Sequence, residues 1–177
     1  MDVEKTIEDL RGRLRRLEDE SAIRRLMTDM MHKADDREHP GYGERMVAFY
    51  TDDGKWTSAS GFADVAMDER GRAALRKKFS AGTRIRESSH LLGTESIEVD
   101  GDSADGSWLC FEPATLQGPG DSREAVWIMG RYSCEFRRVD GNWKVRTVLY
   151  EGIFCTPYDK GWTEERFVAI HPSAAGG

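Results

Sequence analysis

The stretch "AVWIMGRYSCEFRRVDGNWKVRTVLYEGIF", residues 125–154, decides the fold that we expect. Apolar and polar side chains alternate along it on both sides of Asp140-Gly141, which is the pattern of β-strands. Asp-Gly between two such runs favours a tight turn, because both residue types tolerate the positive φ angles of a type I′ turn. The stretch therefore predicts a long antiparallel hairpin.

A second Asp-Gly pair, Asp100-Gly101, predicts another hairpin immediately before it in the chain. Its arms are the segments "HLLGTESIEV", residues 90–99, and "DGSWLCFEPATL", residues 105–116. Two consecutive hairpins with alternating patterns indicate a mainly antiparallel sheet that occupies the second half of the chain.

The first 34 residues carry apolar side chains at the spacing of helices, with an interruption predicted near residues 18–21. Before the interruption the apolar stripe is narrow and flanked by charges, so residues 1–20 are interpreted as an oligomerisation helix. After it the apolar face is wider and suits packing on a core. The two sets are Val3, Ile7, Leu10, Leu14 and Leu17, then Ile23, Leu26, Met27, Met30 and Met31.

The order of these elements predicts the fold class. Helices come first, including one expected over residues 67–79 with Asp68 as its cap, and long hairpins follow. This order is typical of an α+β fold, with a sheet packed against N-terminal helices. A chain of 177 residues suits one domain, here residues 1–177, with residues 160–177 as a C-terminal tail.

The long strands carry large side chains on both faces. Val126, Ile128, Tyr132 and Phe136 alternate with Trp127 and Met129. A sheet that is apolar on both faces must be covered on both sides. One face suits the helices, and the other suits either a ligand cavity or a subunit contact. The polar Arg131, which shares the face of Trp127 and Met129, favours a cavity or an interface over a plain core.

Composition excludes several classes of function. The chain has 26 Lys and Arg against 32 Asp and Glu, a net charge of −6, which argues against nucleic acid or an anionic membrane as partner. No apolar run approaches the roughly 20 residues that a spanning helix needs, and the charged start lacks a signal core, so we expect a cytoplasmic protein. Three widely spaced cysteines in strand-like segments, Cys110, Cys134 and Cys155, are predicted to be reduced, buried and structural.

Asp35 and Asp36 raise the question of chemistry. Asp35 continues the inward face of Met27 and Met31, at i+8 and i+4, and a carboxylate in such a position needs a partner. His90, at the start of the first long strand, is the candidate, since a His–Asp dyad abstracts a proton from carbon and returns it to a leaving group. The residues alone leave open the alternative of a capping aspartate and an ordinary strand histidine.

A metal site is a second interpretation of the same region. His32, Asp36 and His39 share one helical face at i, i+4 and i+7, and imidazole with carboxylate suits iron, zinc or manganese. Pro40-Gly41 is predicted to end the helix and take His39 out of register. Because no glycine-rich phosphate loop is present either, we expect neither a metal nor an organic cofactor.

Four motifs resemble one known family. The segments "ESAIRRLMTDMMHKADDREH", "FYTDDGKW", "HLLGTESIEVDGDSADG" and "GRYSCEFRRVDGNWKV" are similar, in order and spacing, to the SnoaL-like branch of the nuclear transport factor 2-like superfamily. The resemblance covers nearly the whole chain except its start and its tail. It implies a cone-shaped α+β barrel in which a curved antiparallel sheet encloses a pocket and the first helix forms one wall.

Within that superfamily the chain resembles the cofactor-independent lyases that include hexachlorocyclohexane dehydrochlorinase, bile-acid 7α-dehydratase and scytalone dehydratase. The resemblance places the family aspartate on Asp35 rather than Asp36, and the family histidine on His90, and it implies a homotrimer. "FCTPYDKGW", residues 154–162, adds to the likeness. Groups that assist departure in those lyases are absent: Met30 replaces a tyrosine, Val148 replaces an arginine, and no second pocket histidine lies between Leu91 and Tyr150.

The resulting hypothesis is a lyase acting on a small, largely apolar or aromatic substrate, with water, halide or a small carbonyl such as formaldehyde as leaving group. An isomerase with the same dyad is one alternative. A ligand-binding module, or a small structural subunit of an aromatic-ring dioxygenase, is the other. Besides the dyad, seven residues are predicted to bind substrate: Tyr50, Trp56, Trp108, Trp127, Met129, Arg131 and Tyr150.

Overall fold

The computed structural model describes residues 2–59 and 67–170 of the chain. Its helices are α1 (Val3–Asp35), α2 (Tyr42–Val47), α3 (Gly71–Ser80) and the 3₁₀ turn η1 (Pro119–Asp121). Its strands are β1 (Tyr50–Ala59), β2 (Asp68–Arg70), β3 (Ile85–Ser88), β4 (Leu91–Asp100), β5 (Ser103–Gln117), β6 (Arg123–Val139) and β7 (Asn142–Pro157). The predicted α+β class is confirmed.

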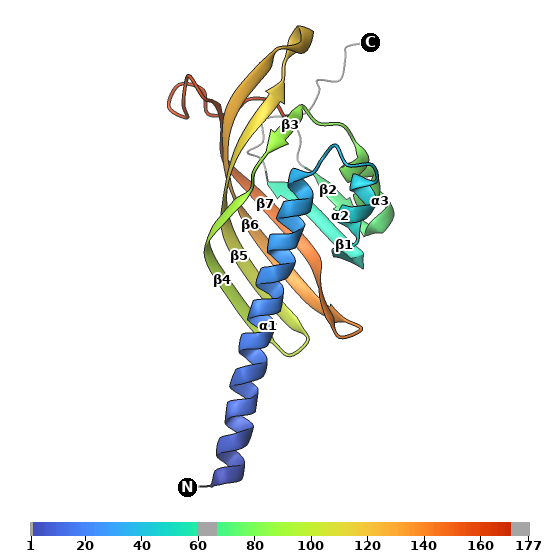
Figure 1. The fold of residues 1–177 in the computed structure, drawn as a ribbon, viewed down its shortest axis with the longest axis vertical. Helices are drawn as coiled ribbons and strands as arrows, with labels where there is room; N and C mark the ends of the chain where they lie inside the picture. Colours follow the sequence, from blue (N-terminus) through green and yellow to red (C-terminus); the bar gives the residue numbers. More distant parts are fainter. Residues whose placement is uncertain (1, 60–66, 171–177) are drawn as a thin grey trace.

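The strands form one seven-stranded sheet in the order β2-β1-β7-β6-β5-β3, with β4 also paired to β5. All pairings are antiparallel except that between β1 and β7. Figure 1 shows the sheet curving around the second half of α1, with α2 and α3 beside it. Both predicted hairpins are confirmed, and Gly101, Asp140 and Gly141 take the positive φ angles expected at their turns.

Helix α1 runs unbroken from Val3 to Asp35, so the predicted interruption near residues 18–21 is wrong. That segment, Glu-Asp-Glu-Ser, contains neither proline nor glycine, and its polarity alone does not stop a helix. Asp19 instead fixes the helix to the β6–β7 hairpin, accepting hydrogen bonds from Arg138 at 2.7 Å and Trp143 Nε1 at 3.0 Å. Figure 1 shows the first half of α1 extending beyond the sheet.

The helix predicted over residues 67–79 begins later than expected. Asp68 to Arg70 form the edge strand β2, and α3 starts at Gly71, whose φ of +78° suits the sharp change of direction. Asp68 therefore does not cap the helix and instead forms ion pairs with Arg70 and Lys55. Within the described ranges, no helix is long and apolar enough to cross a membrane.

The main core lies between α1 and one face of the sheet. Ile23, Met27, Met30 and Met31 pack there against large side chains that include Trp108, Tyr132, Phe136 and Tyr150. The three cysteines are buried and free of disulfides, as predicted. We call this the inner face of the sheet, and the opposite one the outer face.

Candidate active site

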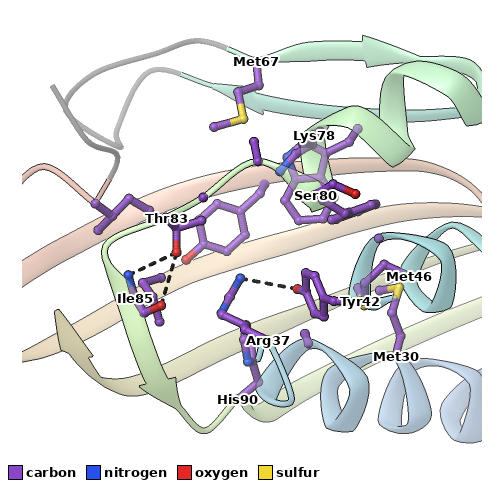
Figure 2. A pocket seen from close by; sticks show the side chains of 18 of the residues that line it. Met30, Arg37, Tyr42, Met46, Met67, Lys78, Ser80, Thr83, Ile85 and His90 are labelled. Atoms are coloured by element: carbon purple, nitrogen blue, oxygen red, sulfur yellow. Dashed lines mark hydrogen bonds between the residues drawn. The ribbon is translucent and has the colours of Figure 1, made fainter. Parts of the chain in front are cut away.

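A cavity of about 750 Å³ opens where the last turns of α1 meet α2, α3 and the inner face of the sheet (Figure 2). This volume lies in the range of small-molecule sites. Met30, Met31 and Ala34 line it from α1, and Ile128 and Tyr132 line it from β6. The cavity is therefore mostly apolar, and the polar groups within it stand out.

Asp35 and His90 meet at its wall. Asp35 is the last residue of α1, and His90 lies between β3 and β4. Asp35 Oδ1 is 2.6 Å from His90 Nδ1, and the other carboxylate oxygen accepts the His90 backbone N–H at 3.1 Å. The Ser88 hydroxyl donates to Asp35 Oδ1 at 3.1 Å. Since the His90 side chain is only 4% exposed, these contacts fix its ring in one orientation.

The carboxyl of Asp35 is ionised at neutral pH. Burial alone would raise its pKa, but hydrogen bonds from His90 and Ser88, together with the charge of His90, outweigh burial and lower that pKa below its usual value. When the His90 ring is neutral, an ionised Asp35 accepts the proton of Nδ1, so that the lone pair lies on Nε2, on the far side of the ring. This is the tautomer in which His90 acts as a base.

Glu112 and Arg37 add two charged groups to the cavity beside the dyad, and neither was predicted from the sequence. Glu112 Oε2 lies 3.5 Å from His90 Nε2, and Glu112 Oε1 lies 3.7 Å from Arg37. Arg37 also donates to the hydroxyl of Tyr42 at 3.4 Å. Among the described residues, neither Glu112 Oε1 nor Arg37 Nε has a hydrogen-bond partner, although both atoms are buried. Polar atoms in this state are candidates for contact with a ligand.

A signal for Glu112 was present in the sequence. In β5, Glu112 lies on the same face as Cys110 and Ala114, and all three side chains are buried. A carboxylate in a buried position of a strand is costly unless it has a function or a partner.

The seven predicted substrate-binding residues divide into three groups. Trp56 and Tyr150 line the cavity. Tyr50 and Trp108 do not, because they are 1% and 2% exposed within the core and are already surrounded by other side chains.

Trp127, Met129 and Arg131 do not line the cavity either. They lie at the positions of β6 that alternate with the buried Ile128 and Tyr132, so the pleat of the strand directs them to the outer face. Trp127 stacks there on Phe111, with ring centroids 5.3 Å apart. The prediction that these three residues bind substrate in the cavity is corrected on this ground.

The alternative metal ligands are not gathered into a cage. Helix α1 ends at Asp35, Asp36 forms an ion pair with Arg45 at 2.7 Å, and His32 and His39 are exposed. In the part of the chain that the structure describes, no group of three or more His, Cys, Asp or Glu side chains is arranged to hold a metal ion.

Comparison with known proteins identifies the family. The SnoaL-like domain matches residues 15–148, which include every residue that lines the cavity except Tyr150 and Ile170. The chain belongs to the SnoaL-like domain family. No curated protein sequence matches it at a significant level.

Solved structures show the same fold. A hexachlorocyclohexane dehydrochlorinase of type 3 from Novosphingobium barchaimii is 21% identical, with a TM-score of 0.68, over 90% of this chain and 98% of that one. A protein of Novosphingobium aromaticivorans, provisionally named a scytalone dehydratase, is 20% identical, with a TM-score of 0.67, over 92% and 97%. An NTF2-like protein with a cystatin-like fold from the latter organism is 20% identical, with a TM-score of 0.57, over 89% and 93%. At this identity the likeness establishes fold rather than activity.

Proposed function

We propose that this SnoaL-like chain is a cofactor-independent lyase that acts on a small, largely apolar or aromatic substrate. The observation that carries the proposal is the 2.6 Å contact between Asp35 and His90 at the wall of the cavity. The names of two similar structures, a dehydrochlorinase and a dehydratase, describe eliminations and support a lyase-type or ligand-binding role.

The dyad supplies the first step. Nε2 of His90 takes a proton from a substrate carbon, and the electrons of the C–H bond form a C=C bond while the bond to the leaving group breaks. Asp35 holds the ring and stabilises the imidazolium that results. When the leaving group is a hydroxyl, the proton returns to its oxygen, water departs and His90 is neutral again.

A phenol of the cavity wall is a candidate to hold the leaving oxygen or a substrate carbonyl. Tyr132 and Tyr150 both line the cavity, with ring centroids 4.8 Å apart. Burial raises the pKa of both phenols well above 10, so they remain O–H donors at neutral pH.

An isomerase is the second candidate, and Glu112 is the observation that favours it. A carboxylate 3.5 Å from the same imidazole nitrogen provides a second place for the abstracted proton. Delivery of that proton to another carbon, without loss of a group, moves a double bond. Glu112→Gln should then impair proton return more than proton abstraction.

The test measures removal of the proton from the substrate carbon. The purified chain is incubated in D₂O with a panel of aromatic β-hydroxy and β-halo ketones, and proton NMR records both loss of the leaving group and exchange at carbon. We expect elimination that falls by about 10² or more in His90→Ala and in Asp35→Asn. Elimination that persists in both variants contradicts the proposal. Double-bond migration with the leaving group retained favours the isomerase, and binding without exchange favours a ligand-binding module.

A further inference from the structure

Lys78 is a cation inside an otherwise apolar part of the cavity. It lies near the end of α3 and lines the cavity together with Trp56 and Phe79. Its Nζ is 4.5 Å from the centroid of the Trp56 ring and 5.1 Å from that of Phe79. Figure 2 shows Lys78 entering the cavity from the side opposite His90.

The ammonium group forms no ion pair with any carboxylate of the described residues. Within the described residues, no Asp or Glu oxygen lies within 4 Å of Lys78, although neighbouring cations are paired. Arg76, two residues earlier in α3, pairs with Glu44 of α2, and Arg37 pairs with Glu112 of β5. A lysine normally extends its charged end into bulk water, whereas this one lies over two aromatic rings at the wall of a cavity.

The surroundings make the charge costly. Burial, followed by the nearby charge of Arg37, lowers the pKa of Lys78 to about 8, and the charge of Glu69 in β2 acts in the opposite direction. At neutral pH the group is still mostly protonated. A desolvated cation without a carboxylate partner gains most when a ligand brings a negative charge.

We propose that Lys78 binds an anionic oxygen of the ligand, so that the cavity selects flat aromatic acids over neutral compounds of the same shape. Trp56 and Phe79 contact the ring system of such a ligand, and the dyad faces its other end. The proposal goes beyond the elimination reaction, because it concerns binding and holds even if His90 turns nothing over.

The experiment compares two probes that differ only in charge. 2-Naphthoate and 2-naphthamide have nearly the same size, and isothermal titration calorimetry measures the affinity of each. Lys78→Met keeps the length of the side chain but removes its charge, and Lys78→Arg keeps the charge. The matched control is Lys77→Met, since Lys77 is the exposed neighbour in the same helix. Near-UV circular dichroism verifies the fold of each variant.

We expect the native chain to prefer naphthoate, and Lys78→Met to weaken naphthoate binding by about ten-fold or more while naphthamide binding changes less than about two-fold. Lys78→Arg and Lys77→Met should retain the preference. Naphthoate binding should also weaken as the pH rises through about 8, where Lys78 loses its proton, and naphthamide binding should not.

Three results would overturn the proposal: equal affinity of the native chain for both probes, unchanged naphthoate affinity in Lys78→Met, or no binding of either probe at millimolar concentration. None of them bears on the dyad. With a carboxylate-bearing substrate, elimination that depends on His90 but not on Lys78 would support the lyase and contradict the anion site.

Discussion

The two faces of the sheet are both apolar, yet among the described residues the cavity of about 750 Å³ lies on the inner face, and a smaller hollow of about 330 Å³ lies beside Trp127 and Tyr158 on the outer face. On the inner face, helices cover the strands, and Glu112, Tyr132 and Tyr150 place polar atoms among buried side chains. On the outer face, Phe111, Tyr158 and Trp162 are 37%, 66% and 57% exposed. Apolar side chains therefore do not distinguish the cavity of the inner face from the exposed outer face, whereas buried polar atoms do.

The largest expected effect belongs to the inner face. His90→Ala and Asp35→Asn should each lower turnover by about 10² to 10⁴, because each removes the positioned base or its orienting partner. The double variant should be little worse than either single one, since the two residues act as a unit. Steady-state kinetics on whichever substrate is eliminated gives these values.

Two matched controls make the comparison sharp. Arg131→Ala alters an exposed side chain of the outer face, and Asp36→Asn alters the carboxylate next to the dyad, which pairs with Arg45 at 2.7 Å instead. Both should keep most of the activity, because exposed ion pairs and surface charges contribute little. An inactive Asp36→Asn beside an active Asp35→Asn would reverse our assignment of the two aspartates.

Sequence patterns predicted those features that local geometry controls. The period of two and the Asp-Gly turns predicted both hairpins, and the spacing of Met27, Met31 and Asp35 predicted that the Asp35 carboxylate points inward. The meeting of Asp35 with His90 depends on tertiary packing. The motif resemblance indicated it, whereas spacing alone left it open.

Two features could not be predicted from the sequence: the face of the sheet that the helices cover, and the edge strand β2. Since both faces of β6 are apolar, alternation could not tell whether Trp127 or Ile128 pointed to the cavity. The edge strand β2 escaped notice because three residues are too few for a periodic signal, and its pairing with β1 is a long-range contact.

A stability effect of intermediate size tests the packing of the inner face. A Cβ atom on Gly130 of β6 would collide with the phenol end of Tyr150, so Gly130→Ala should destabilise the fold by about 1–3 kcal/mol. Gly93→Ala in β4 is the control, because a Cβ there meets nothing within 4 Å. Urea denaturation measures both, and equal midpoints would show that Tyr150 moves aside without cost.

A smaller effect concerns pH and the dyad. The folded-state pKa of Asp35 lies below its usual value, since the hydrogen bonds from His90 and Ser88 and the charge of His90 outweigh burial. The ionised carboxyl therefore contributes stability that is complete above the unfolded pKa of about 3.9 and is lost as the pH falls through the folded one. The difference in unfolding free energy between the native chain and Asp35→Asn should shrink as the pH falls below about 4. A difference that stays unchanged down to about pH 2 would show that Asp35 is not held as an anion.

The smallest effect on turnover should come from the outer face, where we expect an effect on assembly instead. Phe111 and Trp127 stack on each other, and Phe154 stacks on Trp162, on a face that is accessible in the single chain. Exposed apolar patches of this kind mark contacts between proteins. The family resemblance makes a homotrimer the expected assembly. Trp127→Gln should then change turnover by less than about two-fold per chain, since an outer-face side chain lies away from the cavity, but it should weaken association of the copies.

The exposed apolar stripe at the start of α1 offers a second surface for assembly, so Leu14→Gln tests the helix and Trp127→Gln tests the sheet. Light scattering at micromolar concentration measures the mass of each. If only Leu14→Gln dissociates, the helix and not the sheet holds the copies together. A native chain that is monomeric would show that neither apolar surface forms a contact between copies.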